Sequence, residues 1–221
     1  MSFLTDIIKL IDKYGDVFLS GLVGTLWFSL ITIALGTLLG MLIALMRMGK
    51  VRVLRVIAEA YVEILRGTPV LLQLYVFWIG LPKIFPFITD TQSIVTALII
   101  NASAYISEII RAGINAVDKG QWEAARSIGL SNSHVMTKVI LPQAVKNILP
   151  ALCNEFITTI KGTSLCSVFF VGELMTSYKM VQSVTFLPMP TLTIVGIIYF
   201  IMNFGLSRLL KMLERRLMLS D

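Results

Sequence analysis

Several polar side chains interrupt the most apolar stretches of this sequence, and their types suit a pathway for a polar solute. Strongly polar groups are costly at bilayer depth, so such residues face protein, water or a passing ligand rather than lipid. Amide, hydroxyl and carboxylate groups recur on separate apolar runs. They are Asn101 and Ser103 in the run 91–110, and Glu155, Thr158 and Thr159 in the run 142–161.

Catalytic and metal-binding signatures are absent from the sequence. It contains no GxxxxGK[ST] phosphate loop, no HExxH zinc motif and no GxSxG nucleophile elbow. Its single histidine, His134, is interpreted as a surface residue of a helix, and no metal site is expected. Cys153 and Cys166 lie in apolar surroundings without a CxxC motif, which favours small packing residues. A transport pathway is therefore better supported than an enzyme active site.

Membrane helices must position these polar groups. Of the 221 residues, 56% are hydrophobic and 14% are charged, and the mean hydropathy is +0.83. A soluble domain has roughly a quarter of its residues charged, so the composition indicates a polytopic membrane protein. The net charge of +6 comes from basic residues at the ends of apolar runs, a pattern of membrane loops rather than of nucleic-acid binding.

Hydropathy predicts an all-α bundle of about five transmembrane helices. The spans are expected at residues 17–46, 56–79, 91–110, 142–161 and 191–210, with an amphipathic helix at 3–14, an external loop at 81–90 and a partial or re-entrant helix at 165–181. The helix at 3–14 either lies on the membrane face or docks against the bundle. Basic clusters after the first and last spans predict an outer N-terminus and a cytoplasmic C-terminus.

The second span carries a break and several charges. Gly67-Thr68-Pro69 weakens a helix. Glu63 and Arg66 are three residues apart and are spaced to pair on one helical face. The same spacing recurs in Glu108 and Arg111, and we interpret all four as structural ion pairs near the cytoplasmic face.

A polar segment, residues 121–144, separates the third and fourth spans. Residues 121–127 have good helix propensity, and Gly129 can end that helix in a left-handed turn. Ser131, Asn132 or Ser133 can cap a second helix that runs to about residue 140. Pro142 then suits the start of the next span, where its missing N–H is harmless.

The spacing inside this segment resembles the EAA motif of the membrane subunits of bacterial ABC importers. Glu123-Ala124-Ala125 is followed after three residues by Gly129, and after nine more by Val139, one residue, and Leu141-Pro142. The motif has isoleucine where Val139 stands. Further stretches resemble the polar amino acid subfamily. They are 65–69 (LRGTP) with Gln73, 104–113 (AYISEIIRAG), with Ala112 for a glycine, and 154–165 (NEFITTIKGTSL).

The resemblance implies a single domain, 1–221, of the ABC type I importer transmembrane class, with a cytoplasmic coupling region at 121–141. It implies a bacterial cytoplasmic-membrane permease that moves an amino acid by alternating access. Its partners would be two ABC ATPase subunits, which bind the ATP and Mg, a second permease copy or homologous permease, and an external amino-acid-binding protein. No cofactor is expected in this chain itself.

The resemblance also assigns roles to individual residues. The residues expected to contact the ATPase are Glu123, Ala124, Ala125, Gly129, Leu141 and Pro142. The small side chains of Ala124 and Ala125 would let this short helix sit deep in a groove on the ATPase. A zwitterionic amino acid needs a carboxylate for its ammonium group and a cation or helix N-termini for its own carboxylate. Substrate contact is expected of Glu155, Gly67, Thr68, Asn101, Ser103, Thr158 and Thr159. The alternative for this second set is interhelical polar packing.

Gly162 stands where related sequences frequently have an acidic residue, which favours neutral or polar substrates over arginine or lysine. Two other classes of function are weighed against the importer. An ion-driven secondary transporter is disfavoured by the short chain and the EAA spacing. A non-transporting scaffold is disfavoured because it has no reason to keep costly polar groups on three spans.

Overall fold

The computed structural model describes residues 2–218, and the surroundings of side chains are described for residues 2–212. Every regular element in that part of the chain is helical. The elements are α1 (Phe3–Met48), α2 (Arg52–Gly67), α3 (Val70–Ile84), α4 (Asp90–Asn115), α5 (Lys119–Ser127), α6 (Asn132–His134), the π-helical turn η1 (Val135–Ile140), α7 (Leu141–Gly162), the 3₁₀ turn η2 (Thr163–Phe169), α8 (Leu174–Thr185) and α9 (Pro188–Met218).

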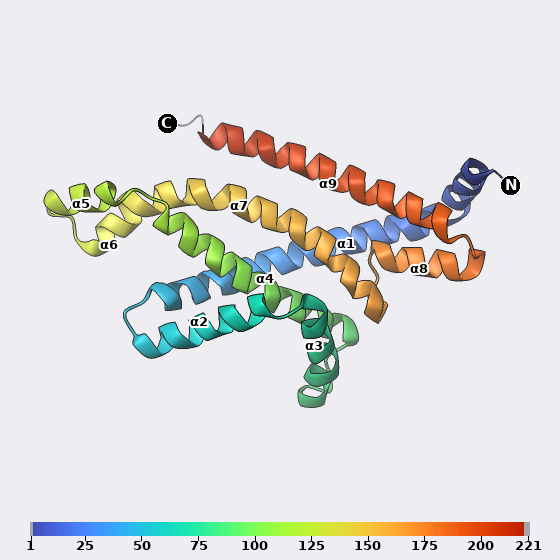
Figure 1. Ribbon diagram of the computed structural model, residues 1–221, viewed down its shortest axis with the longest axis horizontal. Coiled ribbons are helices and arrows are strands. Elements are labelled where there is room, and N and C mark those ends of the chain that lie inside the picture. Colours follow the sequence, from blue (N-terminus) through green and yellow to red (C-terminus); the bar gives the residue numbers. More distant parts are fainter. Residues whose placement is uncertain (1, 219–221) are drawn as a thin grey trace.

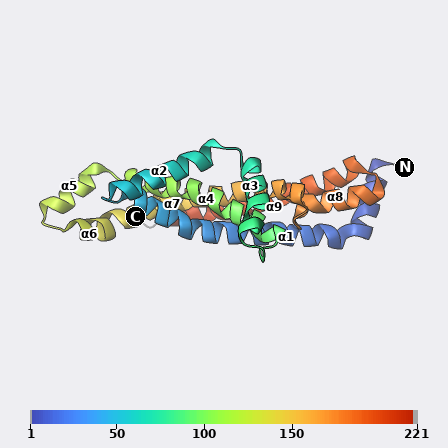
Figure 2. The ribbon, with the colours of Figure 1, turned by 90° about the horizontal axis from the view of Figure 1, so that it is seen from below.

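The long helices α1, α4, α7 and α9 run along one axis and form an elongated bundle (Figure 1). The short helices α5 and α6 project from one end of it, while α8 and the N-terminus lie at the other end (Figures 1 and 2). Helix α3 crosses the bundle near its middle. The chain thus places a polar projection at one end of an apolar body.

Three of the described helices, α1, α4 and α9, are long and apolar enough to cross a membrane. The pair α2 and α3 passes the same test together but bends by 109° between its halves. Helix α7 has 22 residues, a length of about 33 Å at 1.5 Å per residue, but its polar residues lower its hydropathy. Three of the five expected spans therefore pass this test, the second passes it only as a sharply bent pair, and α7 is long enough but does not pass it.

The bend between α2 and α3 follows from local sequence. Proline cannot continue the hydrogen-bond ladder of a helix, and it forces the residue before it into an extended conformation. Thr68 accordingly has φ −115° and ψ 146°, and Pro69 caps the next helix. The predicted break at Gly67-Thr68-Pro69 is confirmed, and it turns the chain instead of merely weakening the helix.

A stripe of small residues along α1 sets how closely the bundle packs. A Cβ atom built on Gly40 would lie 2.9 Å from the Ser103 carbonyl oxygen of α4, and one on Gly24 would overlap the Gly172 carbonyl oxygen. Small residues allow such backbone approach in membrane bundles. The buried members of the stripe are Gly21, Thr25, Ser29, Thr32, Gly36 and Gly40.

The N-terminal helical segment and the first span meet at a kink within α1. Tyr14, with φ −122° and ψ 15°, marks a kink inside α1. Leu10 is buried against the α8–α9 end of the bundle, whereas Leu4 and Ile8 are exposed. The segment 3–14 therefore docks with one face and leaves a second apolar face uncovered.

Two boundary predictions were wrong. Residues 81–84, expected in a loop, continue α3 through Pro82. The expected helix at 165–181 is instead two pieces, η2 and α8, separated where Phe170 adopts a left-handed conformation with φ 53°. Glu173 then caps α8, accepting hydrogen bonds from the backbone N–H groups of Met175 (2.8 Å) and Thr176 (2.6 Å).

Candidate functional site

The polar projection, which we call the polar hairpin, comprises α5, α6 and η1. Asp118 caps α5 by accepting a hydrogen bond from the Gly120 N–H at 2.7 Å. Gly129 has φ 87°, the left-handed turn that its sequence position predicts. Of the three candidate caps, Ser131 is the one whose side chain accepts from the His134 N–H. The helix–turn–helix prediction for this segment is thereby confirmed.

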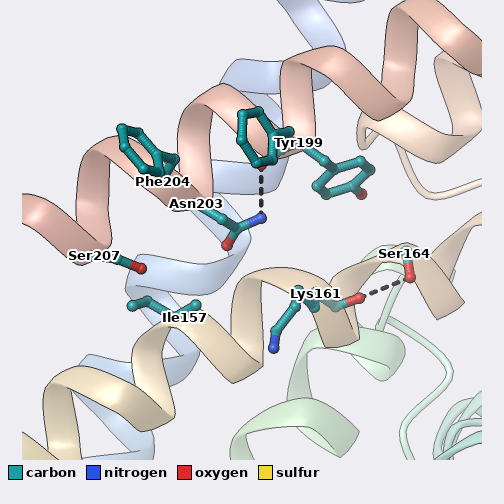
Figure 3. Close-up of a pocket in the computed structure, with 8 residues that line it drawn as sticks. Ile157, Lys161, Ser164, Tyr199, Asn203, Phe204 and Ser207 are labelled. Carbon is teal, nitrogen blue, oxygen red and sulfur yellow. Dashed lines mark hydrogen bonds between the residues drawn. The ribbon is translucent and has the colours of Figure 1, made fainter.

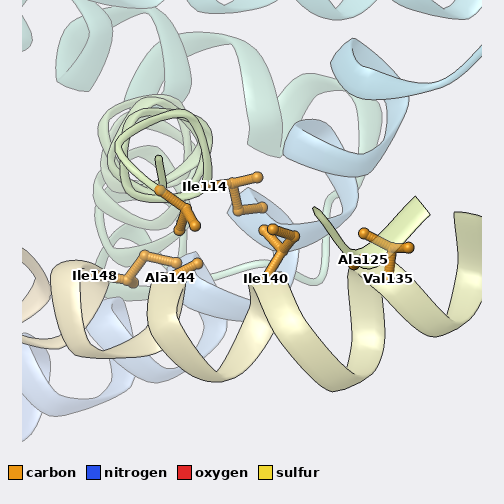
Figure 4. Close-up of a cluster of buried hydrophobic side chains, with 7 residues drawn as sticks. Ile114, Ala125, Val135, Ile140, Ala144 and Ile148 are labelled. Carbon is orange, nitrogen blue, oxygen red and sulfur yellow. The ribbon is translucent and has the colours of Figure 1, made fainter. Parts of the chain in front are cut away.

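One side of the polar hairpin is anchored in a hydrophobic cluster with the ends of α4 and α7 (Figure 4). The buried members of that cluster are Ile114, Val117, Ala125, Val135, Ile140, Ala144 and Ile148. Ala125 is only 5% exposed, while its motif neighbours Glu123 and Ala124 are exposed. The EAA residues thus divide into one that holds the hairpin and two that face outward.

Pro142 lies in the first turn of α7, as the sequence predicts, but α7 does not begin as a separate helix. The helical path is continuous from α6 through η1 into α7, and the Leu141 N–H donates to the Met136 carbonyl, five residues back. The wider π turn provides room where a proline lacks its N–H and would clash with the preceding turn. Leu141 and Pro142 are both exposed at the start of α7, next to the hairpin.

A cavity of about 200 Å³, which we call the bend pocket, lies where α3, α4, α7 and η2 meet. Four residues predicted to touch substrate line it, Asn101, Glu155, Thr158 and Thr159. The other lining residues are Val70, Leu98, Tyr105, Gly162 and Leu165. Glu155 is the one carboxylate among these residues, all of which lie in the described part of the chain.

The bend beside this pocket is held by an amide network that the sequence did not reveal. The Asn101 Nδ2 donates to Gln73 Oε1 at 2.9 Å, and Gln73 Nε2 donates to Thr68 Oγ1 and to the Leu65 carbonyl, both at 2.8 Å. Thr68 therefore supports the pocket through Gln73 instead of lining it. Gly67 is exposed and does not line the cavity.

Ser103 lies outside the bend pocket. Its hydroxyl pairs with the Tyr61 hydroxyl at 2.7 Å and donates to the Ile100 carbonyl at 2.7 Å, so it joins α4 to α2. The interhelical packing alternative describes its geometry. Ser103 is two residues from Asn101 on α4, so the two side chains face different neighbours. The sequence alone does not tell which neighbouring helix each of them faces.

Three arginines gather around Glu108, beside the pocket. Arg47 donates to Glu108 Oε2 at 2.7 Å, Arg111 contacts both carboxylate oxygens, and Arg66 lies 3.8 Å from Oε2. The predicted Glu108–Arg111 pair is confirmed, but Arg66 lies against Glu108 instead of Glu63. Arg47 was missed because its position, 61 residues from Glu108 in sequence, gives no pairing signal.

A larger cavity of about 570 Å³ separates α7 from α9 (Figure 3). Lys161 of α7 and Asn203 of α9 line it, and Asn203 Nδ2 donates to the Tyr199 carbonyl at 2.8 Å. Its walls combine the apolar side chains of Ile157, Phe200 and Phe204 with polar side chains of α7, η2 and α9. None of the residues that line this larger cavity is acidic, whereas the bend pocket holds Glu155 beside three other residues predicted to touch substrate. We therefore take the bend pocket as the candidate site.

A bent-helix bundle with a polar pocket and an outlying polar hairpin defines a helical membrane transport subunit. The sequence matches the family "Binding-protein-dependent transport system inner membrane component" over residues 36–219, and the chain belongs to that family. In this family of transporter permeases the ATPase activity lies in a separate subunit, and this chain is not itself an enzyme.

Individual relatives are similar over nearly the whole chain. The "Arginine transport system permease protein ArtQ" of Bacillus subtilis (strain 168) is 39% identical, covering 92% of this chain and 93% of that protein. The "Putative glutamine transport system permease protein GlnP" of Rickettsia bellii (strain RML369-C) is 37% identical, with 89% and 90% covered. A chain of the solved "Crystal structure of an amino acid ABC transporter with histidines" is 42% identical, with TM-score 0.90 and coverage of 98% and 99%.

These comparisons establish the function at the level of class. The chain is the permease subunit of an ABC importer for amino acids in the inner membrane, and it works with an ATPase and a substrate-binding partner.

Proposed function

We propose that the bend pocket is where an amino acid pauses inside the membrane, and that the polar hairpin is the contact through which the ATPase changes access to it. The observation on which this rests is the placement of Glu155, beside Thr158, Thr159 and Asn101, in a cavity at the bend. A carboxylate in a span needs a cationic partner, and the ammonium group of an amino acid supplies one.

The polar hairpin has the form that a coupling element needs. Its hydrophobic cluster ties it to the ends of α4 and α7, and both of these helices also line the bend pocket. A displacement of the exposed residues Glu123, Ala124 and Gly129 is therefore carried along two rigid helices to the pocket. Leu141 and Pro142 extend the exposed surface toward the membrane.

We propose the following assembly. Two ATPase subunits bind ATP and Mg and dock on the hairpins of two permeases, a second copy of this chain or a homologue. A substrate-binding protein docks on the opposite face. The hairpin is cytoplasmic and so is the C-terminus, while the N-terminus is outside, because the basic clusters at 47–55 and 208–216 then lie on the cytoplasmic side.

The pocket favours a neutral or polar amino acid. Glu155 is the one acidic group lining it, and Gly162 leaves open space, with nothing within 4 Å of a Cβ built there. A second acidic group for a cationic side chain is thus missing at that position. Two of the relatives described above are named for arginine and glutamine transport, so both amino acids belong in the test.

Uptake by proteoliposomes tests the proposal. Vesicles containing the permease with its co-purified ATPase and binding protein are expected to accumulate L-glutamine only when ATP is present, with weaker uptake of L-arginine. Permease alone, under an imposed proton or sodium gradient, is expected to accumulate neither amino acid. Uptake by the permease alone would establish a secondary transporter and overturn the proposal.

A further inference from the structure

Arg66 occupies an unusual place for an arginine. It is the last residue but one of α2, about 21 Å along the helix from Arg52 at 1.5 Å per residue. Figures 1 and 2 show α2 ending near the middle of the bundle, where α3 turns away. Its side chain is nevertheless 43% exposed. A guanidinium exposed at the bend is accessible to a ligand or a partner.

The ion cluster around Glu108 does not use Arg66 fully. Arg47 and Arg111 hydrogen-bond the two carboxylate oxygens, whereas the guanidinium of Arg66 is 3.8 Å away, beyond hydrogen-bond length. Three guanidinium groups therefore share one carboxylate. Arg66 keeps its planar set of N–H donors available for a second anion, and bidentate binding of a carboxylate is what that geometry suits best.

Arg66 also lies next to the bend pocket. Its guanidinium carbon is 5.6 Å from the centre of the Tyr105 ring, and Tyr105 lines the pocket. Val70, which follows Arg66 across the bend, lines the pocket as well. The pocket wall itself offers the carboxylate of Glu155 but no cation. A zwitterion held at Glu155 by its ammonium group would need its counter-charge from just outside that wall.

We propose that Arg66 binds the α-carboxylate of the transported amino acid, while Glu155 binds its ammonium group. The site then recognises the dipolar backbone common to amino acids and leaves the side chain to the rest of the pocket. This assignment rests on the proposed amino acid site in the bend pocket, and it makes Arg66 a binding residue instead of a purely structural one.

Removing the carboxylate from the ligand tests this assignment directly. The permease–ATPase complex in lipid nanodiscs would be titrated with L-glutamine, L-histidine and L-arginine, and with their decarboxylated counterparts 4-aminobutanamide, histamine and agmatine. Charge-assisted hydrogen bonds predict that the wild type prefers the amino acid over its amine by about tenfold to a hundredfold. In Arg66→Gln the amino acid should bind as weakly as the amine, and binding of the amine should stay unchanged.

Matched variants separate recognition from structure. Arg52→Gln, an exposed arginine at the other end of the same helix, should keep the full preference. Glu155→Gln should weaken binding of the amino acid and of its decarboxylated amine equally, since both ligands carry the ammonium group. Arg66→Lys keeps the charge and should recover part of the preference, and it also serves as the test variant if Arg66→Gln fails to fold.

The possible failures are distinguishable. If Arg66→Gln weakens acid and amine alike, or keeps the preference for the acid, Arg66 is structural and only this assignment falls. A lysine that recovers nothing would likewise contradict a charge-based role. If the wild-type complex binds none of the three amino acids, the amino acid site of the bend pocket is itself wrong and Arg66 loses its proposed role with it.

Discussion

The polar hairpin and the bend pocket show two ways in which a membrane protein places functional groups. The hairpin is built from one short stretch of chain, capped by Asp118 and Ser131 and turned at Gly129. The pocket draws its groups from α3, α4, α7 and η2, which meet only in the folded bundle. Local chemistry specifies the first region, and packing specifies the second. A single substitution should therefore act differently in each.

The largest effect is expected at Gly129. Valine at φ 87° is strained by about 1–3 kcal/mol, as for other non-glycine residues in sparsely populated backbone regions, so the turn must rearrange and move the exposed motif residues. Gly129→Val should reduce ATP-driven uptake at least about tenfold, the factor equivalent to 1.4 kcal/mol, with ligand binding unchanged. Gly129→Asn should keep most of the uptake, because asparagine tolerates the left-handed region.

Uptake assays on proteoliposomes containing each variant would measure this difference. Equal uptake by the valine and asparagine variants would show that the conformation of the turn does not matter for coupling. Loss of amino acid binding in Gly129→Val would show that the hairpin and the pocket are not separate functional regions.

A substitution at Glu155 changes the bend pocket and leaves the hairpin intact. Glu155→Gln removes the charge but keeps the size, and the loss of a charge-assisted hydrogen bond should weaken binding of an amino acid by about tenfold to a hundredfold. The thermal stability of the complex and its basal ATPase rate should stay the same, because the hairpin is untouched. Calorimetric titration measures the binding affinity, and a melting curve measures the thermal stability. Unchanged affinity would remove Glu155 from the site.

Neighbouring alanines sharpen the comparison inside the hairpin. Ala125 is 5% exposed in the hydrophobic cluster, so Ala125→Leu should overpack it and cost about 1–3 kcal/mol of stability. Ala124 is exposed, and Ala124→Leu should change stability by less than about 0.5 kcal/mol while reducing stimulation of the ATPase. Melting temperatures and ATPase rates of the two variants would be compared. The reverse pattern would mean that the two alanines exchange roles.

The smallest effect is expected at Thr158. Its hydroxyl already donates to the Asn154 carbonyl at 3.1 Å, so Thr158→Val should weaken binding only about two- to tenfold, as for loss of a neutral hydrogen bond. Ser103→Ala serves as the control, because Ser103 bonds Tyr61 outside the pocket. A stronger effect of the serine change on ligand affinity would place the site elsewhere on α4.

The sequence predicted the hairpin almost completely. Its structure is determined by helix propensity, a capping side chain and a left-handed glycine, all of which depend only on residues close in sequence. Pro142 lies in the first turn of α7 as predicted, but no local signal predicted the π turn through which the helix runs on into α7. The bend at Gly67-Thr68-Pro69 was also predictable, because proline acts on its neighbours. Its angle of 109° was not, because the packing of α3 across the bundle sets it.

The pocket could be predicted only in part. Four of its lining residues are polar residues in apolar runs: Asn101, Glu155, Thr158 and Thr159. Contact of a polar side chain with lipid is energetically costly, so these residues are predicted to face inward. Thr68 and Ser103 carry the same signal but serve the network of Gln73 and the contact with Tyr61. Hydropathy does not distinguish a polar group that lines a cavity from one that joins two helices, because both face away from lipid.

The central claim is that the exposed motif residues of the hairpin touch the ATPase. Ala124→Cys, in a background lacking Cys153 and Cys166, would be labelled with a photoreactive maleimide in the assembled complex and illuminated. The matched control is Met189→Cys, because Met189 is 63% exposed and follows Pro188, the first residue of α9. That end of α9 lies beside α8, at the end of the bundle opposite α5 (Figure 1). The account predicts a covalent product with the ATPase subunit from the first variant and none from the second. A product from Met189→Cys, or none from Ala124→Cys, would contradict it.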